Sequence, residues 1–279
     1  MIGGGGVAGI AWATGMMAGL ERQGIDVMRA DAFIGTSAGS VVGTQLACGI
    51  SPQFLLEALL SPRNDSLERT RPYSQAAAEQ SNRLLMLKVG GDLGAARRRI
   101  GAFALRSETV PLATRRAIVA ARLPQTLWPA ANLRVVAVDT ASGEYRVFDR
   151  SSGVELVDAV AASCAVPGAW PPVPIGGQLY MDGGIRSLTN ADMAQGAERV
   201  IVIAPLGWAE GNPVSGHLRA EADMLRAAGA LLSVIVPDEA SARAIGDNVL
   251  DPERCAPSAR AGLAQGLRSA ASLVTVWTT

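Results

Sequence analysis

One serine of this chain stands where a nucleophile would be placed. Residues 31–39 read Asp-Ala-Phe-Ile-Gly-Thr-Ser-Ala-Gly, an apolar run that ends in the pattern Gly-x-Ser-x-Gly with Ser37 at its centre. Between a strand and a helix this pattern makes a sharp turn, and the hydroxyl at its apex projects clear of the backbone. Gly35 and Gly39 flank the serine because a Cβ at either position would crowd the strand against the helix. The pattern therefore predicts a nucleophilic serine at a strand-to-helix elbow.

A glycine run near the start of the chain could supply the anion site that acyl transfer needs. Residues 3–6 are all glycine, and after Gly9 comes an apolar stretch, 10–20, that predicts a helix. A glycine loop that opens a helix presents unpaired backbone N–H groups to a phosphate or to the oxyanion of an acyl-transfer intermediate.

The same glycines allow a second interpretation. Gly4, Gly6 and Gly9 spell Gly-x-Gly-x-x-Gly, the dinucleotide-binding fingerprint, and Asp26 lies near the acidic position of that fingerprint. The fingerprint needs a strand before the glycines, and only two residues precede them, so dinucleotide binding is the weaker interpretation. A flexible glycine-rich terminus is a third.

The best candidate for the base that would activate Ser37 is Asp182. It lies in the segment 178–184, Gln-Leu-Tyr-Met-Asp-Gly-Gly, which predicts a short strand followed by a turn at Asp182. The chain contains one histidine, His217, in a loop-like run before a charged helix, which is typical of a solvated residue. A Ser-His-Asp triad therefore has a single candidate histidine in a poor setting. Activation by a carboxylate alone requires its oxygens to lie within about 2.6–3.2 Å of the serine hydroxyl.

Together these segments resemble the patatin-like phospholipases. The glycine loop, Gly-x-Ser-x-Gly and Asp-Gly-Gly occur in that family's order, and residues 162–173, Ala-Ser-Cys-Ala-Val-Pro-Gly-Ala-Trp-Pro-Pro-Val, look like its Ala-Ser-x-Ala-x-Pro stretch. The resemblance runs from about Gly3 to Val202. It implies an α/β fold with three layers, α/β/α, around a mostly parallel central sheet, and a lipid acyl hydrolase that needs no metal or cofactor.

The resemblance also assigns roles to residues. It implies that Ser37 is the nucleophile, that Asp182 is its general base in a Ser-Asp dyad, and that amides of the glycine loop form the oxyanion hole. The loop residues concerned are Gly4, Gly5 and Gly6, and the motif glycines around the site are Gly9, Gly35, Gly39, Gly183 and Gly184.

The chain departs from the family pattern in two places. Ala8 stands where the family loop commonly carries Arg or Lys, and only Met1 and Ile2 occupy the place of the strand before the loop. Two alternatives therefore stay open: an α/β-hydrolase-type esterase that uses His217, and a catalytically impaired homologue that binds lipid.

Composition limits the partners. The 279 residues suit one large domain with an insertion, with 49% hydrophobic residues for its core. The 25 basic and 25 acidic residues balance, which argues against nucleic acid as the main partner and against a general attraction to anionic membranes. The run Arg97-Arg98-Arg99 could contact a headgroup in a transient membrane-surface encounter, although a solvated helix face is the simpler interpretation. The oligomeric state is not readable from the sequence.

Cysteine usage and hydropathy indicate a cytoplasmic protein that is at most peripheral at the membrane. The three cysteines, Cys48, Cys164 and Cys255, are widely spaced and form no disulfide or metal-ligand pattern. Every long apolar stretch is interrupted well before the roughly 20 residues that a bilayer span requires, and no basic segment precedes a hydrophobic run at the start.

The chain is predicted to consist of a large domain that contains an insertion, followed by a shorter C-terminal part. Residues 1–205 form the predicted patatin-like catalytic domain, 61–130 form a helical insertion or cap within it, and 206–279 form a mostly helical part packed on the same domain. Helices are expected at 75–89 and 112–122, and strands at 133–139, 144–148, 200–204 and 234–236. The apolar residues Trp12, Met16 and Met17 suit core packing better than the lining of an acyl channel.

Overall fold

The structure is a computed structural model that describes residues 1–61 and 71–277. Its strands are β1 (Ala32–Thr36), β2 (Asn132–Asp139), β3 (Tyr145–Phe148), β4 (Val173–Ile175), β5 (Gln178–Asp182), β6 (Arg199–Ile203) and β7 (Leu231–Ile235). Its helices are α1 (Gly6–Arg22), α2 (Ala38–Ala47), α3 (Pro52–Leu60), α4 (Gln75–Lys88), α5 (Leu93–Arg106), α6 (Leu112–Ala120), α7 (Leu156–Ser163), α8 (Leu218–Ala227), α9 (Glu239–Ile245) and α10 (Cys255–Trp277).

The strands form a mixed sheet whose parallel part holds the predicted nucleophile. β1 pairs in parallel with β2, and β6 pairs in parallel with β7. Ile2 forms parallel bridges to both Gly35 in β1 and Ile203 in β6, so the start of the chain lies between these strands and joins them. β3 and β5 pair with β2 in the antiparallel sense, as β4 does with β5. The chain thus has a mixed α/β fold, and the three-layer order of that fold stays a prediction.

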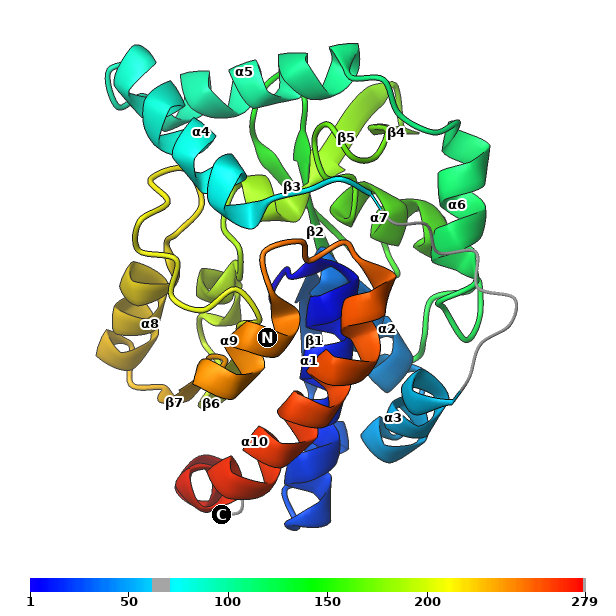
Figure 1. The fold of residues 1–279 in the computed structure, drawn as a ribbon, viewed down its shortest axis with the longest axis vertical. Helices are drawn as coiled ribbons and strands as arrows, with labels where there is room; N and C mark the ends of the chain where they lie inside the picture. The colour runs from blue at the N-terminus through cyan, green and yellow to red at the C-terminus, as the bar shows by residue number, and fades with distance from the viewer. Residues whose placement is uncertain (62–70, 278–279) are drawn as a thin grey trace.

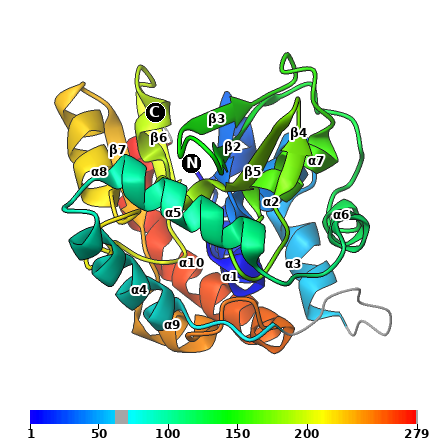
Figure 2. The same cartoon turned by 90° about the horizontal axis from the view of Figure 1, so that it is seen from above.

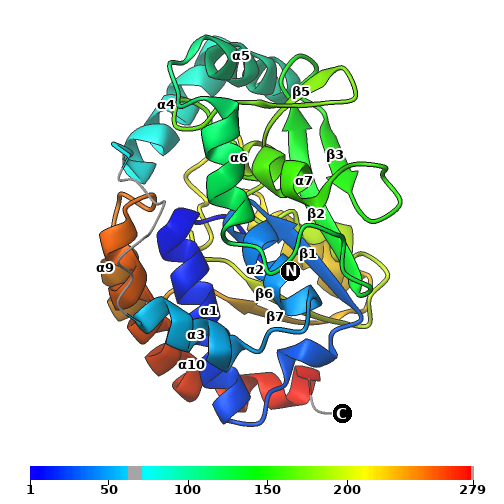
Figure 3. The ribbon, with the colours of Figure 1, turned by 90° about the vertical axis from the view of Figure 1, so that its right-hand side faces the viewer.

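Helices α1 and α10 run side by side along the sheet (Figures 1 and 3). A seam of glycines lets their backbones approach: a Cβ on Gly15 or Gly19 of α1 would collide with backbone atoms of α10, and a Cβ on Gly262 or Gly266 of α10 would collide with α1. Because this seam fits backbone against backbone, the last helix of the chain is an integral part of the packing of the fold.

The core is built around α1 and the inward faces of β1, β2 and α7. Trp12, Met16 and Met17 are at most 1% exposed and belong to the largest apolar cluster. They do not line the cavity described below. Core packing is therefore their role, and the acyl-channel alternative has no support.

Helices α4 and α5 lie across one end of the sheet, at the top of Figure 1 and nearest the viewer in Figure 2. α4 contains no buried residue, and α5 buries only Ala96, Gly101 and Ala104. A Cβ on Gly101 would collide with the backbone of Thr140, so α5 rests on the turn that follows β2. These two helices are held by few apolar contacts, unlike α1.

Most elements agree with the sequence expectations. α3 begins after Ser51, whose Oγ accepts from the N–H of Phe54 at 3.2 Å as an N-cap should. The helices expected at 75–89 and 112–122 and the strands at 133–139, 144–148 and 200–204 are present within a few residues. For α5 the sequence predicted a helix face around the run Arg97-Arg98-Arg99 but no bounds, and β7 begins three residues earlier than the predicted strand. Among the described residues, none of the helices is long and apolar enough to cross a bilayer.

Candidate active site

Ser37 occupies a strained turn between β1 and α2. Its backbone angles are φ 53° and ψ −120°, in a region that residues with a Cβ rarely adopt. Ser163, at the end of α7, holds the turn because its Oγ accepts from the N–H of Ser37 at 2.9 Å. A Cβ on Gly39 would collide with the carbonyl of Ile2, and one on Gly35 would collide with the start of α2. The flanking glycines are thus a steric requirement of the elbow.

The sheet register brings Asp182 to this serine. β1 and β5 lie on opposite sides of β2, where Thr36 pairs with Val136 and Asp182 pairs with Ala137. The two strands therefore end at the same level, although their residues are far apart in sequence. Ser37 Oγ donates a hydrogen bond of 2.6 Å to Asp182 Oδ2, and the other carboxylate oxygen accepts from the N–H of Gly184 at 2.7 Å.

Burial dominates the electrostatics of Asp182, which is 4% exposed. Removal from water raises the pKa of this carboxyl to about 6, while the hydrogen bonds from Ser37 and Gly184 and the charge of Arg115 pull the pKa downward. Arg115 reaches the site from α6. Its guanidinium lies 3.9 Å from the ring centre of Trp170, and its Nη2 donates to the carbonyl of Cys164 at 3.3 Å.

The glycine loop lies beside the serine, and its amides differ in what they bind. The N–H of Gly4 donates to the carbonyl of Leu188 at 2.8 Å, so in this structure that group is committed to the fold. Within the described part of the chain, the N–H groups of Gly5 and Gly6 donate to no other group. Of the three amides predicted to form an oxyanion hole, those of Gly5 and Gly6 are therefore available to a ligand in this structure, whereas the amide of Gly4 anchors the loop.

Two neighbours explain why the loop consists of glycines. A Cβ on Gly5 would lie 2.7 Å from Pro205 Cβ, and a Cβ on Gly6, whose φ is +59°, would collide with the carbonyl of Val249. Gly9 is the first residue of α1 whose N–H bonds back to the loop, at 2.7 Å from the carbonyl oxygen of Gly5. The loop is thus clamped between the end of β6 and the segment that precedes α10.

A cavity of about 680 Å³ opens above the serine and the aspartate. Its floor contains Gly5, Gly6, Ser37 and Asp182, and its roof is formed by α4 and α5. Apolar side chains contribute much of the wall: Leu85, Ile100, Phe103, Val166, Leu188 and Leu250. A volume of this size is in the range of binding sites for organic ligands of moderate size.

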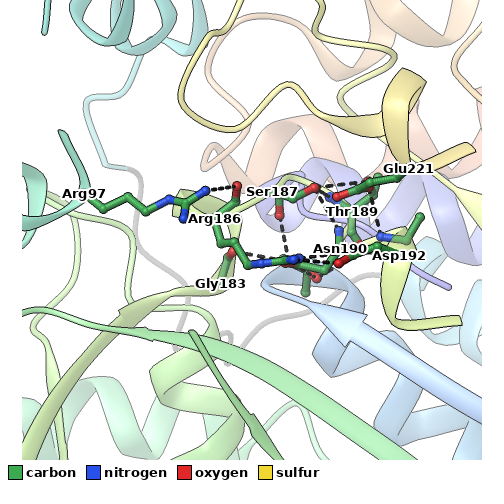
Figure 4. A network of polar contacts seen from close by, with 10 residues as sticks. Arg97, Gly183, Arg186, Ser187, Thr189, Asn190, Asp192 and Glu221 are labelled. Carbon is green, nitrogen blue, oxygen red and sulfur yellow. Dashed lines mark hydrogen bonds and ion pairs between the residues drawn. The ribbon is translucent and has the colours of Figure 1, made fainter. Parts of the chain in front are cut away.

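A buried polar network secures the turn that carries Asp182 (Figure 4). The side-chain amide of Asn190 donates to Thr36 Oγ1 at 3.0 Å, to the carbonyl of Ser187 at 2.8 Å and to the carbonyl of Gly183 at 3.3 Å. It thereby links the residue before the serine to the residue after the aspartate. Asn190 itself adopts φ 48°, a left-handed conformation that asparagine tolerates better than most residues.

Charged residues brace this network from outside. Glu221 Oε2 accepts from Thr189 Oγ1 at 2.7 Å and from the N–H of Ala191 at 2.9 Å. Arg186 forms an ion pair with Asp192, and Arg97 of α5 donates to the carbonyl of Arg186 at 3.1 Å (Figure 4). The segment after Asp182 is therefore fixed by contacts to β1, α8 and α5.

The structure gives His217 and Asp26 roles outside the cavity that Ser37 and Asp182 line. His217 precedes α8, with its Nε2 3.0 Å from the carbonyl oxygen of Val214, and it does not line the cavity. Asp26 caps a short 3₁₀ turn by accepting from the N–H of Met28 at 2.9 Å. The three cysteines are free thiols. Within the ranges that the structure describes, no cluster of His, Cys, Asp and Glu could hold a metal ion.

Sequence reasoning missed three residues of the site: Ser163 and Asn190, which hold the turns that carry Ser37 and Asp182, and Arg115, whose charge lowers the pKa of Asp182. Ser163 lies inside the stretch 162–173 that carries part of the family resemblance, so a signal for it was present. Asn190 and Arg115 lie in no recognised motif. Their contacts become visible only when distant segments meet.

An α/β protein with a serine at a strand-to-helix elbow is the class that this geometry defines. The family model of the patatin-like phospholipases matches residues 1–194, and the chain belongs to that family.

Two solved structures are similar to the chain. VipD from Legionella pneumophila is 18% identical over 66% of this chain and 45% of that chain, with a TM-score of 0.37. The type III effector protein ExoU is 16% identical over 96% of this chain and 52% of that chain, with a TM-score of 0.39. The chain matches only about half the length of either protein. No protein with a curated description matches it by sequence.

Proposed function

We propose that the protein hydrolyses acyl ester bonds of lipids, with Ser37 as nucleophile and Asp182 as general base. The observation that carries this proposal is the 2.6 Å hydrogen bond from Ser37 Oγ to Asp182 Oδ2 at the floor of a cavity with largely apolar walls. Membership of the patatin-like phospholipase family supports the choice of a lipid substrate.

The first half of the reaction forms an acyl-enzyme. Ser37 Oγ attacks the ester carbonyl carbon while its proton passes to Asp182, and the carbonyl oxygen becomes an oxyanion. The N–H groups of Gly5 and Gly6 stabilise this charge, each by about 2.7–4 kcal/mol if they act as measured oxyanion donors do. When the intermediate collapses, the C–O bond to the alcohol breaks and the alcohol leaves with the proton from Asp182.

The second half returns the enzyme to its starting state. Asp182 takes a proton from water, the resulting hydroxide attacks the acyl carbon, and the same amides stabilise the second oxyanion. The fatty acid leaves as the bond to Ser37 Oγ breaks, and Ser37 recovers its proton from Asp182. A base with a pKa of about 6 suits both steps, because it is ionised at neutral pH and still basic enough to accept a proton.

In this proposal residues 61–130 serve as a cap on the catalytic domain. α4 and α5 contribute Leu85, Ile100 and Phe103 to the cavity wall, and these side chains would face the acyl chain while the ester group rests on the glycine loop. The cap would also keep water away from the bond between Ser37 and Asp182, which strengthens the electrostatic terms of catalysis.

The test is product analysis with purified protein and a mixed phospholipid substrate. We expect free fatty acid from the wild type and from Ser151→Ala, a control in an exposed turn, and none from Ser37→Ala. A fluorophosphonate should label the first two proteins only. Equal fatty-acid release by Ser37→Ala would refute the proposal, and loss of activity in His217→Ala would favour the triad alternative instead.

A further inference from the structure

The balanced net charge of the chain hides a strong separation of charge. Residues 61–130 carry 12 Lys and Arg against 5 Asp and Glu, whereas the rest of the chain carries 13 against 20. The cap is therefore strongly basic and the remainder is acidic to the same extent. Charge asymmetry between parts of a chain points to an anionic partner for the basic part.

Several basic side chains of the cap face solvent. Lys88 at the end of α4 and Arg98, Arg99 and Arg106 on α5 are exposed. Among the described residues, none of these four forms an ion pair with a carboxylate. Unlike Arg97, which points inward to Arg186, they leave their charge available on the surface.

Large apolar side chains are exposed on the same two helices. Leu84 and Leu87 on α4 and Phe103 and Leu105 on α5 are 52%, 79%, 53% and 49% exposed. On α5 these residues share one stretch with the arginines, since Arg99, Phe103 and Arg106 follow helical spacing. Basic and apolar side chains together on helices are typical of a face that lies on a membrane.

The cavity opens at this face. The cavity-lining residues that are also exposed lie on α4, on α5 and in neighbouring loops: Pro72, Ala77, Ser81, Arg99, Phe103 and Gly168. Arg99 and Phe103 therefore belong both to the cavity wall and to the outer surface of α5. A lipid that left a bilayer beside these residues would enter the cavity directly.

We propose that the exposed face of α4 and α5, defined by Leu84, Leu87, Lys88, Arg98, Phe103, Leu105 and Arg106, docks onto the surface of a bilayer that contains anionic lipids. The choice of a lipid surface rests on the proposed function. The basic side chains attract the headgroups, and the apolar side chains enter the interface between headgroups and acyl chains. The acidic remainder of the molecule is repelled, so that the protein lands with its cavity mouth toward the lipid.

Nucleic acid is the other polyanion that a basic face could bind. Phosphate contacts in nucleic-acid complexes require basic and polar groups, and bases stack on aromatic rings. The cap face offers three leucines for one aromatic ring, which suits an acyl interface better. An RNA homopolymer therefore serves as the competing ligand in the test.

Vesicle cosedimentation tests the docking face. Ser37→Ala is used so that the vesicles are not consumed, with vesicles of phosphatidylcholine alone or with about 30% phosphatidylserine at about 0.1 M salt. We expect binding to the mixed vesicles that weakens as salt increases. Because each basic side chain near an anionic surface contributes about fivefold in affinity, Lys88→Glu/Arg98→Glu/Arg106→Glu should lose roughly 100-fold or more.

A matched variant controls for net charge. Arg29→Glu/Arg150→Glu/Arg260→Glu makes the same charge change at exposed positions elsewhere, and it should retain most of the binding. Leu87→Ser/Leu105→Ser should weaken binding to both kinds of vesicle. Equal losses in the two charge variants, wild-type binding by the cap variant, or preference for the RNA homopolymer over mixed vesicles would each overturn the inference.

Hydrolysis of a soluble short-chain ester separates this inference from the proposed function. For this test the variant Lys88→Glu/Arg98→Glu/Arg106→Glu carries the native Ser37. It should hydrolyse the soluble ester at the wild-type rate and the lipids of the mixed vesicles more slowly. Cap-dependent vesicle binding without ester hydrolysis by the wild type would remove the proposed function and leave the docking face. Hydrolysis of the soluble ester without cap-dependent binding to vesicles would support the proposed function and overturn the docking face.

Discussion

The floor of the cavity and its roof differ in how tightly their residues are buried and hydrogen-bonded. In the floor, Ser37, Asp182 and the glycine loop are buried and fixed by hydrogen bonds from several elements, and most added Cβ atoms would strike backbone. In the roof, α4 buries no residue. The floor therefore has a single tightly defined arrangement, whereas the exposed positions of the roof, above all those on α4, can change with little cost to the fold.

This difference suits two tasks. A nucleophile and a base must be held within a fraction of an ångström, because proton transfer depends steeply on geometry. A surface that meets lipid must instead present charge and apolar area to a soft partner. Substitutions in the floor should therefore alter catalysis or folding, whereas substitutions at exposed roof positions outside the cavity wall should leave both unchanged.

The largest effect is expected at Asp182. Asp182→Asn keeps the size of the side chain but removes the base, so kcat should fall by about 10²–10⁴. The melting temperature should stay near that of the wild type, because the amide still bonds to Ser37 and Gly184. Hydrolysis of a soluble short-chain ester measures the effect, and turnover close to wild type would exclude Asp182 as the base.

Glycine-to-alanine substitutions compare how much an added methyl group destabilises the protein in the floor and in the roof. Gly39→Ala places a Cβ against the carbonyl of Ile2, so we expect a loss of about 3 kcal/mol in the free energy of unfolding. Gly94→Ala in α5 meets only the ends of Arg98 and Asp92 at 3.1 and 3.3 Å. It should be neutral or slightly stabilising, since alanine favours a helix over glycine.

Gly43→Ala is the control within the same helix as Gly39. Its Cβ would lie 3.5 Å from a methyl group of Leu133, an ordinary contact. Thermal unfolding should therefore separate Gly39→Ala from both other variants. Similar melting temperatures for all three would mean that the elbow can yield and that the floor is less rigid than described.

The same contrast explains what the sequence could predict. Ser37, Asp182 and the glycines lie in short motifs whose spacing is set by local turns, so they stand out in the printed sequence. The contact between Ser37 and Asp182 depends on strand register, and it was inferred from family resemblance rather than from spacing.

The interactions that remained hidden are long-range. The N–H of Gly4, one of the predicted oxyanion donors, bonds to the carbonyl of Leu188, and the contact of Asn190 with Thr36 joins residues that are 154 positions apart. The bounds of α5 were not predicted, although its arginine run was interpreted as a helix face, because glycines and the three consecutive arginines interrupt the apolar pattern of this helix. The residues next to a polar residue in the sequence do not indicate which distant residue it will hydrogen-bond to in the folded protein.

The pH profile tests the burial of the floor. Because burial raises the pKa of Asp182 to about 6, the carboxylate is lost as the pH falls through that value. We expect kcat/KM for a soluble ester to be level near pH 7 and to fall about tenfold for each pH unit below about 6. A solvent-exposed aspartate would keep its activity to about pH 4.

Circular dichroism at each pH would show that the fold persists through this range. Activity that stays level down to pH 5 would mean that the carboxyl of Asp182 is less desolvated than its 4% exposure implies.

A smaller effect is expected where the floor is held indirectly. Asn190→Asp keeps shape and backbone preference but replaces the amide donor with an oxygen that faces two carbonyl oxygens and the hydroxyl of Thr36. We expect kcat to fall by about tenfold, with KM little changed, because the base is misplaced while the cavity wall is intact. Asn132→Asp, at an exposed position at the start of β2, is the control.

The split between kcat and KM distinguishes positioning from folding. A variant that merely unfolds in part would lower the amount of active enzyme without moving the pH midpoint. Misplacement of Asp182 should also shift that midpoint, since the bond from Ser37 lowers its pKa. An unchanged kcat in Asn190→Asp would show that the turn is held by its other contacts.

The smallest effect on stability is expected from a Leu→Ala substitution in the roof, although the same substitution in the core is strongly destabilising. Leu46 in α2 is 2% exposed and Leu87 in α4 is 79% exposed. Leu46→Ala should cost about 2–5 kcal/mol in unfolding free energy, whereas Leu87→Ala should stay within about 0.5 kcal/mol. Leu87→Ala should also leave hydrolysis of a soluble ester unchanged, because Leu87 does not line the cavity. If it instead destabilised the protein as Leu46→Ala does, α4 would have to be packed against the fold, and a lipid surface could not reach it.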